Sequence, residues 1–170
     1  MRYRRMRVSG GIYFFTLVTY DRRRLFVDDA NIEVLLHAVE HVRARHPFEI
    51  DAYVVLPEHI HMIWTLPDGD HDFSTRWMLI KSASTRFLKK RLGDEARIWQ
   101  NRFWEHLIGD ERDFSNHVEY VHYNPVHHGY VAAPSEWPHS SFHAFVARGD
   151  YDADWGRDAM PEMKVDRRSE

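Results

Sequence analysis

The 170-residue chain contains no cysteine. This absence excludes disulfide bridges, thiol nucleophiles and cysteine-based zinc sites, so any bound metal must be held by His, Asp, Glu, Asn or Gln. No apolar run reaches the roughly 18 residues of a membrane-spanning helix, and no apolar signal-peptide region follows the basic N-terminus. Internal repeats and low-complexity linkers are also lacking. We therefore expect a cytoplasmic protein with one domain and tails.

The net charge is small, −3, but it is unevenly distributed. Residues 1–148 carry 19 basic and 19 acidic side chains, whereas residues 149–170 carry 4 basic and 7 acidic ones. This division predicts a single domain over residues 1–148, with a basic N-terminal arm, and an acidic C-terminal tail over residues 149–170. The tail could be a solvated end, or it could cover a phosphate-binding surface.

Basic side chains form three short clusters within the neutral body. They lie at the N-terminus, at residues 22–24 and at residues 81–91. Any one cluster can be a solvated face, but three in a small domain favour a polyanionic partner. The predicted DNA contacts are Arg2, Arg4, Arg5, Arg7, Lys81, Arg86, Lys89 and Lys90.

Hydrophobic periodicity predicts four strands and three helices. The strands are expected at residues 12–20, 48–56, 59–66 and 102–109, and the helices at residues 30–45, 74–92 and 111–124. Asp28 or Asp29 would cap the first helix. The order predicts an α+β fold with a ferredoxin-like or RRM-like antiparallel sheet, packed helices and an appended third helix. This fold supports many functions, so the site must decide the activity.

The predicted strand at residues 59–66 contains two histidines, His59 and His61. Side chains of a strand alternate between its faces, so both imidazoles project from one side and could contact one metal ion. Ile60, Met62 and Trp64 would pack on the other side. The same pattern also suits polar residues on a solvated face, and a third ligand from elsewhere is needed to favour the metal site.

The segment "HVEYVHYNPVHHGYV", residues 117–131, supplies a candidate ligand and a candidate nucleophile. On a helix, Tyr120 and Asn124 lie one turn apart on one flank of the buried stripe, whereas Tyr123 points away from the core. Pro125 predicts that the helix ends at Asn124, and Tyr130 would lie beyond that end. Tyr120 could equally be an amphipathic residue at the edge of the core.

Several linked motifs resemble those of the REP-associated tyrosine transposases, a branch of the single-tyrosine HUH transposases of insertion sequences. They are "VLPEH" before His59-Ile60-His61, "WQNRFWEHLIGDERDF" and "EYVHYNPVHHGYV". The similarity runs from "RVSGGIYFFTLVTYDRRRLF" to "WPHSSFHAFVARGDY", nearly the whole chain. His127 departs from the more usual lysine of the family, which affects one presumed phosphate contact and not the chemistry.

The resemblance implies nicking and rejoining of single-stranded DNA on an HUH endonuclease fold, through a 5′-phosphotyrosine. By this resemblance Tyr120 is the nucleophile, and His59, His61 and Asn124 hold a divalent metal, which we expect to be Mg²⁺ or Mn²⁺. The DNA partner would be a REP-like palindromic hairpin with a flanking guide tetranucleotide, read in part by the basic N-terminus. We expect a nucleoid-associated protein, as a monomer or a homodimer.

Two other functions remain open from the sequence. One is a DNA-hairpin-binding protein without catalysis, which would not need the two histidines, the tyrosine and the asparagine. The other is an unrelated histidine-metal hydrolase, but no general-base carboxylate has a motif around it, and Glu58 and Glu105 are only nearby.

Overall fold

The computed structural model describes residues 7–165 and has the predicted order of strands and helices. A short helix that the sequence analysis did not predict, α4, follows them. None of the described helices is long and apolar enough to cross a membrane. The elements are β1 (Ile12–Val18), α1 (Asp29–Arg43), β2 (Glu49–Val55), β3 (His59–Thr65), α2 (Phe73–Leu92), β4 (Trp104–Leu107), α3 (Glu111–His127) and α4 (Phe142–Arg148).

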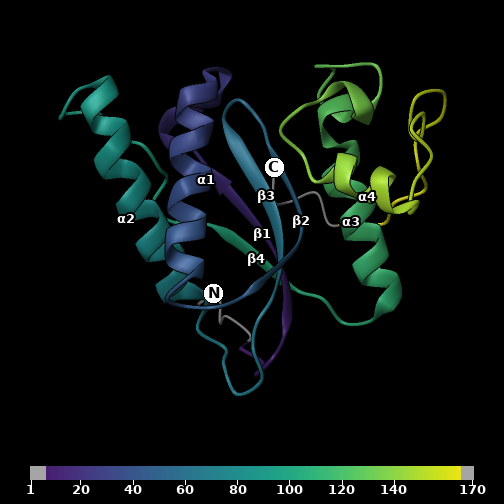
Figure 1. Cartoon of the computed structure of the whole chain (residues 1–170), viewed down its shortest axis with the longest axis horizontal. Coiled ribbons are helices and arrows are strands. Elements are labelled where there is room, and N and C mark those ends of the chain that lie inside the picture. Colours follow the sequence, from purple (N-terminus) through teal and green to yellow (C-terminus); the bar gives the residue numbers. More distant parts are fainter. Residues whose placement is uncertain (1–6, 166–170) are drawn as a thin grey trace, which may run out of the picture.

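The four strands form an antiparallel sheet with the order β2-β3-β1-β4. This confirms the predicted ferredoxin-like arrangement. The two strands that follow one another as a hairpin, β2 and β3, turn at Pro57 and Glu58. Helices α1 and α2 cover one face of the sheet, and α3 and α4 lie on the other side (Figure 1). The central pairing of β1 with β3 sets Thr16 opposite His61 and Val18 opposite His59.

Each face of the sheet has its own apolar core. Under α1 and α2, the rings of Trp64 and Trp77 stack with their centroids 4.1 Å apart. Ile60 and Met62 join this core, as the alternation of β3 predicts. Under α3, Val118 and Val121 pack on the opposite face of the sheet. The strand pattern therefore turns every second residue of β3 toward α3.

Aspartates begin the three long helices by accepting hydrogen bonds from backbone N–H groups in the first turn. Asp28 accepts from Ala30 at 2.9 Å, which settles the choice of cap for α1. Asp72 begins α2 and Asp110 begins α3 in the same way. These caps fix where each helix starts relative to the sheet.

The predicted end of the third helix at Asn124 is wrong, because α3 continues through Pro125 to His127. Proline removes one backbone donor and disfavours a helical residue before it, but it does not remove the carbonyl acceptors. The N–H of His128 donates to the Asn124 carbonyl at 3.0 Å, and Gly129, with a φ of 73°, ends the turn. Burial of Asn124 in the domain outweighs the local preference.

The outer side of α3 is covered by α4 and by the first part of the predicted tail. His122 lies edge-on to the ring of Phe145 at 4.6 Å, and its Nε2 is 2.7 Å from the Ser141 hydroxyl. The rings of Tyr151 and Trp155 pack on the same cluster, and their centroids lie 4.5 Å apart. Residues 151–155 therefore pack on the domain, although composition groups them with the tail.

The buried His122 predicts a pH-dependent stability. Burial, with smaller effects of Arg148 and His143, lowers the pKa of His122 to about 3, whereas a free histidine titrates near 6.5. Between these values the unfolded chain binds the proton and the folded chain does not, so stability falls as pH falls. This group should remove up to about 1.4 kcal/mol of unfolding free energy per pH unit below about 6.5, and nothing above it.

Denaturant unfolding at about pH 7, 6 and 5 measures this slope. The His122→Gln variant should show a shallower decline than the unmodified protein. His41→Gln, which removes an exposed histidine of α1, is the matched control and should keep the slope. Equal slopes for His122→Gln and the unmodified protein would contradict the prediction.

Candidate active site

His59 and His61 project from β3 toward α3, on the same face, with ring centroids 4.9 Å apart. Both side chains are almost completely buried. The sheet therefore holds the two imidazoles side by side in a dry environment, and the alternative of polar residues on a solvated face does not apply.

Each histidine uses its Nδ1 to hold its ring in place. His61 Nδ1 lies 2.8 Å from the Thr16 hydroxyl on β1, and His59 Nδ1 lies 3.1 Å from a carboxylate oxygen of Glu58. The Nε2 atoms of both rings are buried and have no hydrogen-bond partner within residues 7–165. In both rings the second nitrogen, Nε2, is therefore left available to a ligand.

One stripe of α3 faces these rings. The ring of Tyr120 lies 5.4 Å from that of His61, and the ring of His128, just after the helix, lies 5.1 Å from that of His59. Asn124 lies four residues after Tyr120 and four residues before His128, and it is completely buried. The oxygen and the nitrogen of its amide are both without a hydrogen-bond partner in the described part of the chain. The structure therefore brings Tyr120 against the histidine pair, with Asn124 one helical turn further along α3.

This donor set fits a divalent metal ion. Buried polar atoms are nearly always hydrogen-bonded, so the two imidazole nitrogens and the amide that are left unpaired need an explanation. A metal ion accepts lone pairs from neutral imidazole and from an amide oxygen. A second nitrogen fixed by a hydrogen bond is also typical of histidines that bind metals.

The electrostatics keep His61 in the form that a metal needs. Burial, followed by the neighbouring His59, His128 and His117, lowers the pKa of His61 well below its ordinary value, so the ring stays neutral. The hydrogen bond from His59 is the largest effect that lowers the pKa of Glu58, so this carboxyl is ionised near pH 7. Metal binding to histidine requires the neutral ring.

The other two tyrosines of the motif lie in different surroundings. Tyr123 faces away from the sheet, as predicted, but it is buried and meets Trp155 edge-on at 6.3 Å. Tyr130 stacks on Trp137 at 5.5 Å and donates its hydroxyl to Glu58 at 3.2 Å. Only Tyr120 of these three has its ring against a histidine of β3 in the described structure.

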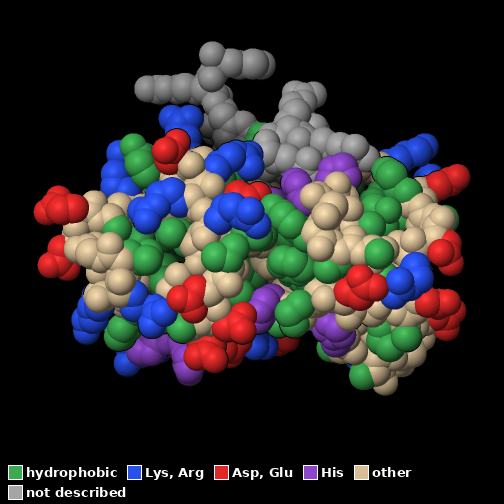
Figure 2. Space-filling model, turned by 90° about the horizontal axis from the view of Figure 1, so that it is seen from above, with side chains coloured by type: hydrophobic (Ala, Val, Ile, Leu, Met, Phe, Trp, Pro, Cys, Tyr) green, Lys and Arg blue, Asp and Glu red, His purple; other side chains and the backbone are tan. Residues whose placement is uncertain are grey.

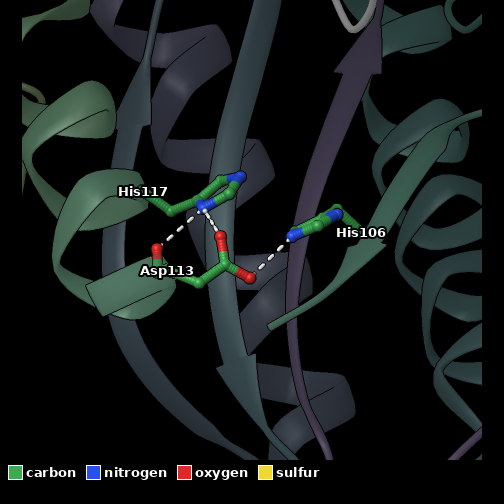
Figure 3. Close-up of side chains that lie close together, drawn as sticks. All are labelled: His106, Asp113 and His117. Carbon is green, nitrogen blue, oxygen red and sulfur yellow. Dashed lines mark hydrogen bonds and ion pairs between the residues drawn. The ribbon is translucent and has the colours of Figure 1, made fainter. Parts of the chain in front are cut away.

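A second cluster, which the sequence analysis missed, joins β4 to the start of α3. The carboxylate of Asp113 lies 2.9 Å from His106 Nε2 and 3.0 Å from His117 Nδ1 (Figure 3). Nitrogen and oxygen atoms of the three residues lie within 4.8 Å of one another, close enough to share a cation. Because the three residues span a strand, a turn and a helix, no single periodicity could have revealed them.

Hydrogen bonds also account for this cluster without an ion. The Gly109 N–H donates to the carboxylate of Asp113, and His117 Nδ1 lies 2.9 Å from the Asp113 carbonyl, so this nitrogen carries a proton. The ring of Phe14 separates the cluster from the histidine pair, with centroids 4.9 Å from His117 and 5.3 Å from His61. We interpret the cluster as a structural hydrogen-bond network that holds the start of α3 on β4.

The predicted DNA-binding residues of α2 do not share one surface. Lys81 and Lys89 line a groove of about 600 Å³ together with Arg97, between α2 and residues 96–101. The ammonium of Lys81 donates to the Gln100 carbonyl at 2.6 Å. Arg86 lines another groove, between α1 and α2, and Lys90 lies over the ring of Phe87.

The groove of Lys81, Lys89 and Arg97 lies beside the end of β1. One wall of the groove, residues 96–101, is joined to the end of β1, because the Gln100 N–H donates to the Val18 carbonyl at 3.0 Å. Val18 pairs with His59 in the sheet. Lys and Arg side chains are more numerous on the α1 and α2 side of the molecule, where Asp and Glu side chains lie among them (Figure 2).

The basic N-terminal arm lies mostly outside the described residues. Arg2, Arg4 and Arg5 fall there, so their predicted contact with DNA stays a prediction. Arg7 is described, and it donates to the Ser74 hydroxyl at 3.3 Å and lies over the ring of Phe73.

Comparison with known proteins gives this fold and site a family. Residues 7–124 match the family described as "Transposase IS200 like". The chain is 47% identical to the REP-associated tyrosine transposase of Escherichia coli K12 over 156 residues, 92% of this chain and 91% of that protein. It is 41% identical to a Haemophilus influenzae protein of the same group, over 96% of each chain.

Solved structures agree with these relatives. The structure of a REP-associated tyrosine transposase bound to a REP hairpin superimposes with a TM-score of 0.86 at 44% identity, covering 100% of this chain and 97% of that one. A Deinococcus radiodurans structure shares the fold alone, with a TM-score of 0.51 at 17% identity over 71% of this chain and 95% of that one. The chain belongs to the IS200-like transposases and, within them, to the REP-associated tyrosine transposases with an HUH fold.

Proposed function

We propose that this protein is a metal-dependent single-stranded DNA endonuclease and strand transferase that acts at palindromic hairpin repeats through a 5′-phosphotyrosine. The observation that carries the proposal is the buried set of unpaired atoms beside Tyr120, namely Nε2 of His59 and of His61 and the amide of Asn124. A protein that only bound hairpins would gain nothing from burying these atoms, because each unpaired one costs about 1–3 kcal/mol of stability.

His59, His61 and Asn124 would hold the divalent ion, either Mg²⁺ or Mn²⁺. Two imidazoles and one amide oxygen leave coordination positions open for water and phosphate oxygens. When bound there, the ion supplies Lewis-acid polarisation of the scissile phosphate and stabilises the charge that builds on its oxygens.

Tyr120 supplies the nucleophile. Its phenolic oxygen attacks phosphorus, the bond from phosphorus to the 3′ oxygen breaks, and the DNA 5′-phosphate becomes esterified to the tyrosine. The proton that leaves the phenol is balanced by the one that the departing 3′ oxygen takes up. Because one phosphodiester replaces another, a 3′-OH can later reverse the step and join strands.

A solved relative and the surface of this chain support a proposal for the substrate. The related structure holds a REP hairpin, and a side chain fixed on a buried helix face can reach a phosphate only in an unpaired strand. We propose a REP-like hairpin with a flanking guide tetranucleotide as partner, bound by a monomer or homodimer. A cytoplasmic, nucleoid-associated location follows from this partner.

The groove lined by Lys81, Lys89 and Arg97 is suited to hold the DNA backbone that leaves the site. Arg97 lies 4.1 Å over the ring of Tyr20, which is itself partly exposed, so a cation and an aromatic face stand together at the groove. Basic grooves with aromatic platforms are typical of single-strand binding surfaces.

The first prediction concerns the nucleophile. Tyr120→Phe removes one oxygen while keeping the ring in the core, so folding and hairpin binding should persist while the covalent adduct disappears. The measurement is a denaturing gel of protein incubated with single-stranded hairpin DNA and Mn²⁺. His59→Ala should also lose cleavage, but excess Mn²⁺ should restore part of it, whereas no metal concentration should rescue Tyr120→Phe.

Tyr123→Phe is the matched control, because it removes the hydroxyl of another buried tyrosine on the same helix and should leave the adduct unchanged. An adduct with Tyr120→Phe but not with Tyr123→Phe would overturn the assignment. Tight hairpin binding by the unmodified protein without any adduct would instead support the non-catalytic DNA-binding alternative, and hydrolysis without an adduct would support the unrelated metal hydrolase.

A second prediction concerns the groove. If Lys89 and Arg97 neutralise phosphates, Lys89→Ala and Arg97→Ala should each weaken hairpin binding and reduce the slope of log affinity against log salt by about 0.7. Arg148→Ala is the control, because it removes the same charge from α4, where Arg148 pairs with Asp150. A slope unchanged by Lys89→Ala and Arg97→Ala would show that the DNA does not follow this groove.

The end of the described chain approaches the same face of the sheet. Met163 and Val165 pack against the apolar cluster that includes Tyr120, Val54 and Leu56. The tail could therefore compete with DNA, as its charge suggests. Removing residues 150–170 would be a poor test, because Tyr151 and Trp155 cover α3.

We therefore expect a sharper result from truncation after Asp158. This cut keeps Tyr151, Trp155 and the ion pair of Arg157 with Glu136, which measures 2.8 Å. Hairpin affinity or the rate of adduct formation should rise. If both stay level at an unchanged unfolding temperature, the segment after Asp158 has no inhibitory role.

A further inference from the structure

A hydrogen-bonded chain of three residues stands behind the histidine pair. The carboxylate of Glu58, in the turn between β2 and β3, lies 3.1 Å from His59 Nδ1 through one oxygen. Its other oxygen accepts the hydroxyl of Tyr130 at 3.2 Å. Tyr130 comes from the segment after α3, 72 residues further along the chain. The turn before the metal-ligand strand is thereby tied to the end of the helix that carries Tyr120.

Glu58 is held at both its backbone and its side chain. The backbone N–H and the hydroxyl of Thr19 donate to the Glu58 carbonyl at 2.9 and 3.0 Å. The Tyr130 ring is fixed between its stacking partner Trp137 and the guanidinium of Arg24, which lies 5.8 Å from the ring centroid. The side chain of Glu58 is only 13% exposed, so these contacts determine its orientation.

The chemistry of the chain sets the tautomer of His59. An ionised carboxylate can only accept hydrogen bonds, so His59 Nδ1 and the Tyr130 hydroxyl must both be donors. With its proton on Nδ1, the neutral ring has its lone pair on Nε2, the buried atom without a partner among residues 7–165. The negative charge also makes His59 a stronger ligand and offsets part of the charge of a cation.

We propose that Glu58 and Tyr130 are positioning residues that fix the tautomer and orientation of His59 for a divalent ion, with Tyr130 acting through Glu58. The inference rests on the proposed function, since it needs the ion at His59, His61 and Asn124. It gives Tyr130 a role in the site other than that of nucleophile. It also distinguishes the two histidines, because the Nδ1 of His61 is held by the neutral hydroxyl of Thr16.

The test is direct binding of Mn²⁺ to the full chain without DNA. Calorimetry, or the electron paramagnetic resonance signal of free Mn²⁺, measures this binding. Glu58→Gln keeps the size of the side chain and removes the charge, and it should weaken Mn²⁺ binding by about 10- to 100-fold. Tyr130→Phe should weaken it by a smaller factor. Tyr123→Phe, which removes the hydroxyl of a tyrosine on the side of α3 that faces away from the sheet, is the matched control and should bind Mn²⁺ as the unmodified protein does.

Two further readouts separate positioning from a general structural effect. In the double variant, Tyr130→Phe should add almost nothing to the loss from Glu58→Gln, because it acts through the same carboxylate. Nitrogen NMR of the histidines should show His59 protonated on Nδ1 in the unmodified protein and as a mixture of tautomers in Glu58→Gln. Additive losses, or a His59 tautomer unchanged in Glu58→Gln, would overturn the inference.

The failure of the inference differs from the failure of the proposed function. If His59→Ala binds Mn²⁺ as tightly as the unmodified protein, the metal site itself is wrong. If His59→Ala loses Mn²⁺ while Glu58→Gln keeps full affinity, the metal site stands and only the role of Glu58 and Tyr130 is refuted. Unfolding temperatures of all variants, measured without metal, confirm that each comparison is made between folded proteins.

Discussion

The burial of two imidazole nitrogens is the constraint on which the rest of the structure depends. Nε2 of His59 and of His61 lie unpaired in the described structure, and each such atom costs about 1–3 kcal/mol when no ligand satisfies it. Only a central strand can hold them dry, and β3 is paired on both sides, with β1 and β2. This cost is offset by Ile60, Met62 and Trp64, which alternate with the histidines along β3 and bury their side chains in the core on the opposite face.

The second requirement is that α3 meets the histidines with one particular face. Val118 and Val121 pack on the sheet, and this sets the rotation that turns Tyr120 and Asn124 toward β3. The hydrogen bonds of Asp113 hold the start of the helix on β4, more than one turn before Tyr120. A helix that is fixed at its start and continues past Pro125 carries the proposed nucleophile, Tyr120, on a rigid element, which favours a defined geometry over an adaptable one.

Much of this could be predicted from the sequence, because the signals depend on near neighbours. Alternation in β3 placed His59 and His61 on one face, and helical spacing placed Tyr120 and Asn124 on one flank. What escaped prediction depends on contacts between distant segments. The helix continues through Pro125 because the whole domain buries Asn124. Helix α4 is stabilised by its packing on His122 of α3. The bond between Glu58 and Tyr130 joins residues with no common periodicity.

Under the proposed mechanism, the chemistry provides little driving force of its own. A tyrosine phosphodiester replaces a DNA phosphodiester, so the direction depends on which 3′-OH is present when the step reverses. The protein must therefore retain the cleaved strand rather than release it. The groove of Lys81, Lys89 and Arg97 lies beside the end of β1, the strand that pairs with β3, and we expect it to hold backbone phosphates of the cleaved strand. Electrostatic retention of this kind is non-specific, which leaves the choice of hairpin to contacts made elsewhere on the domain.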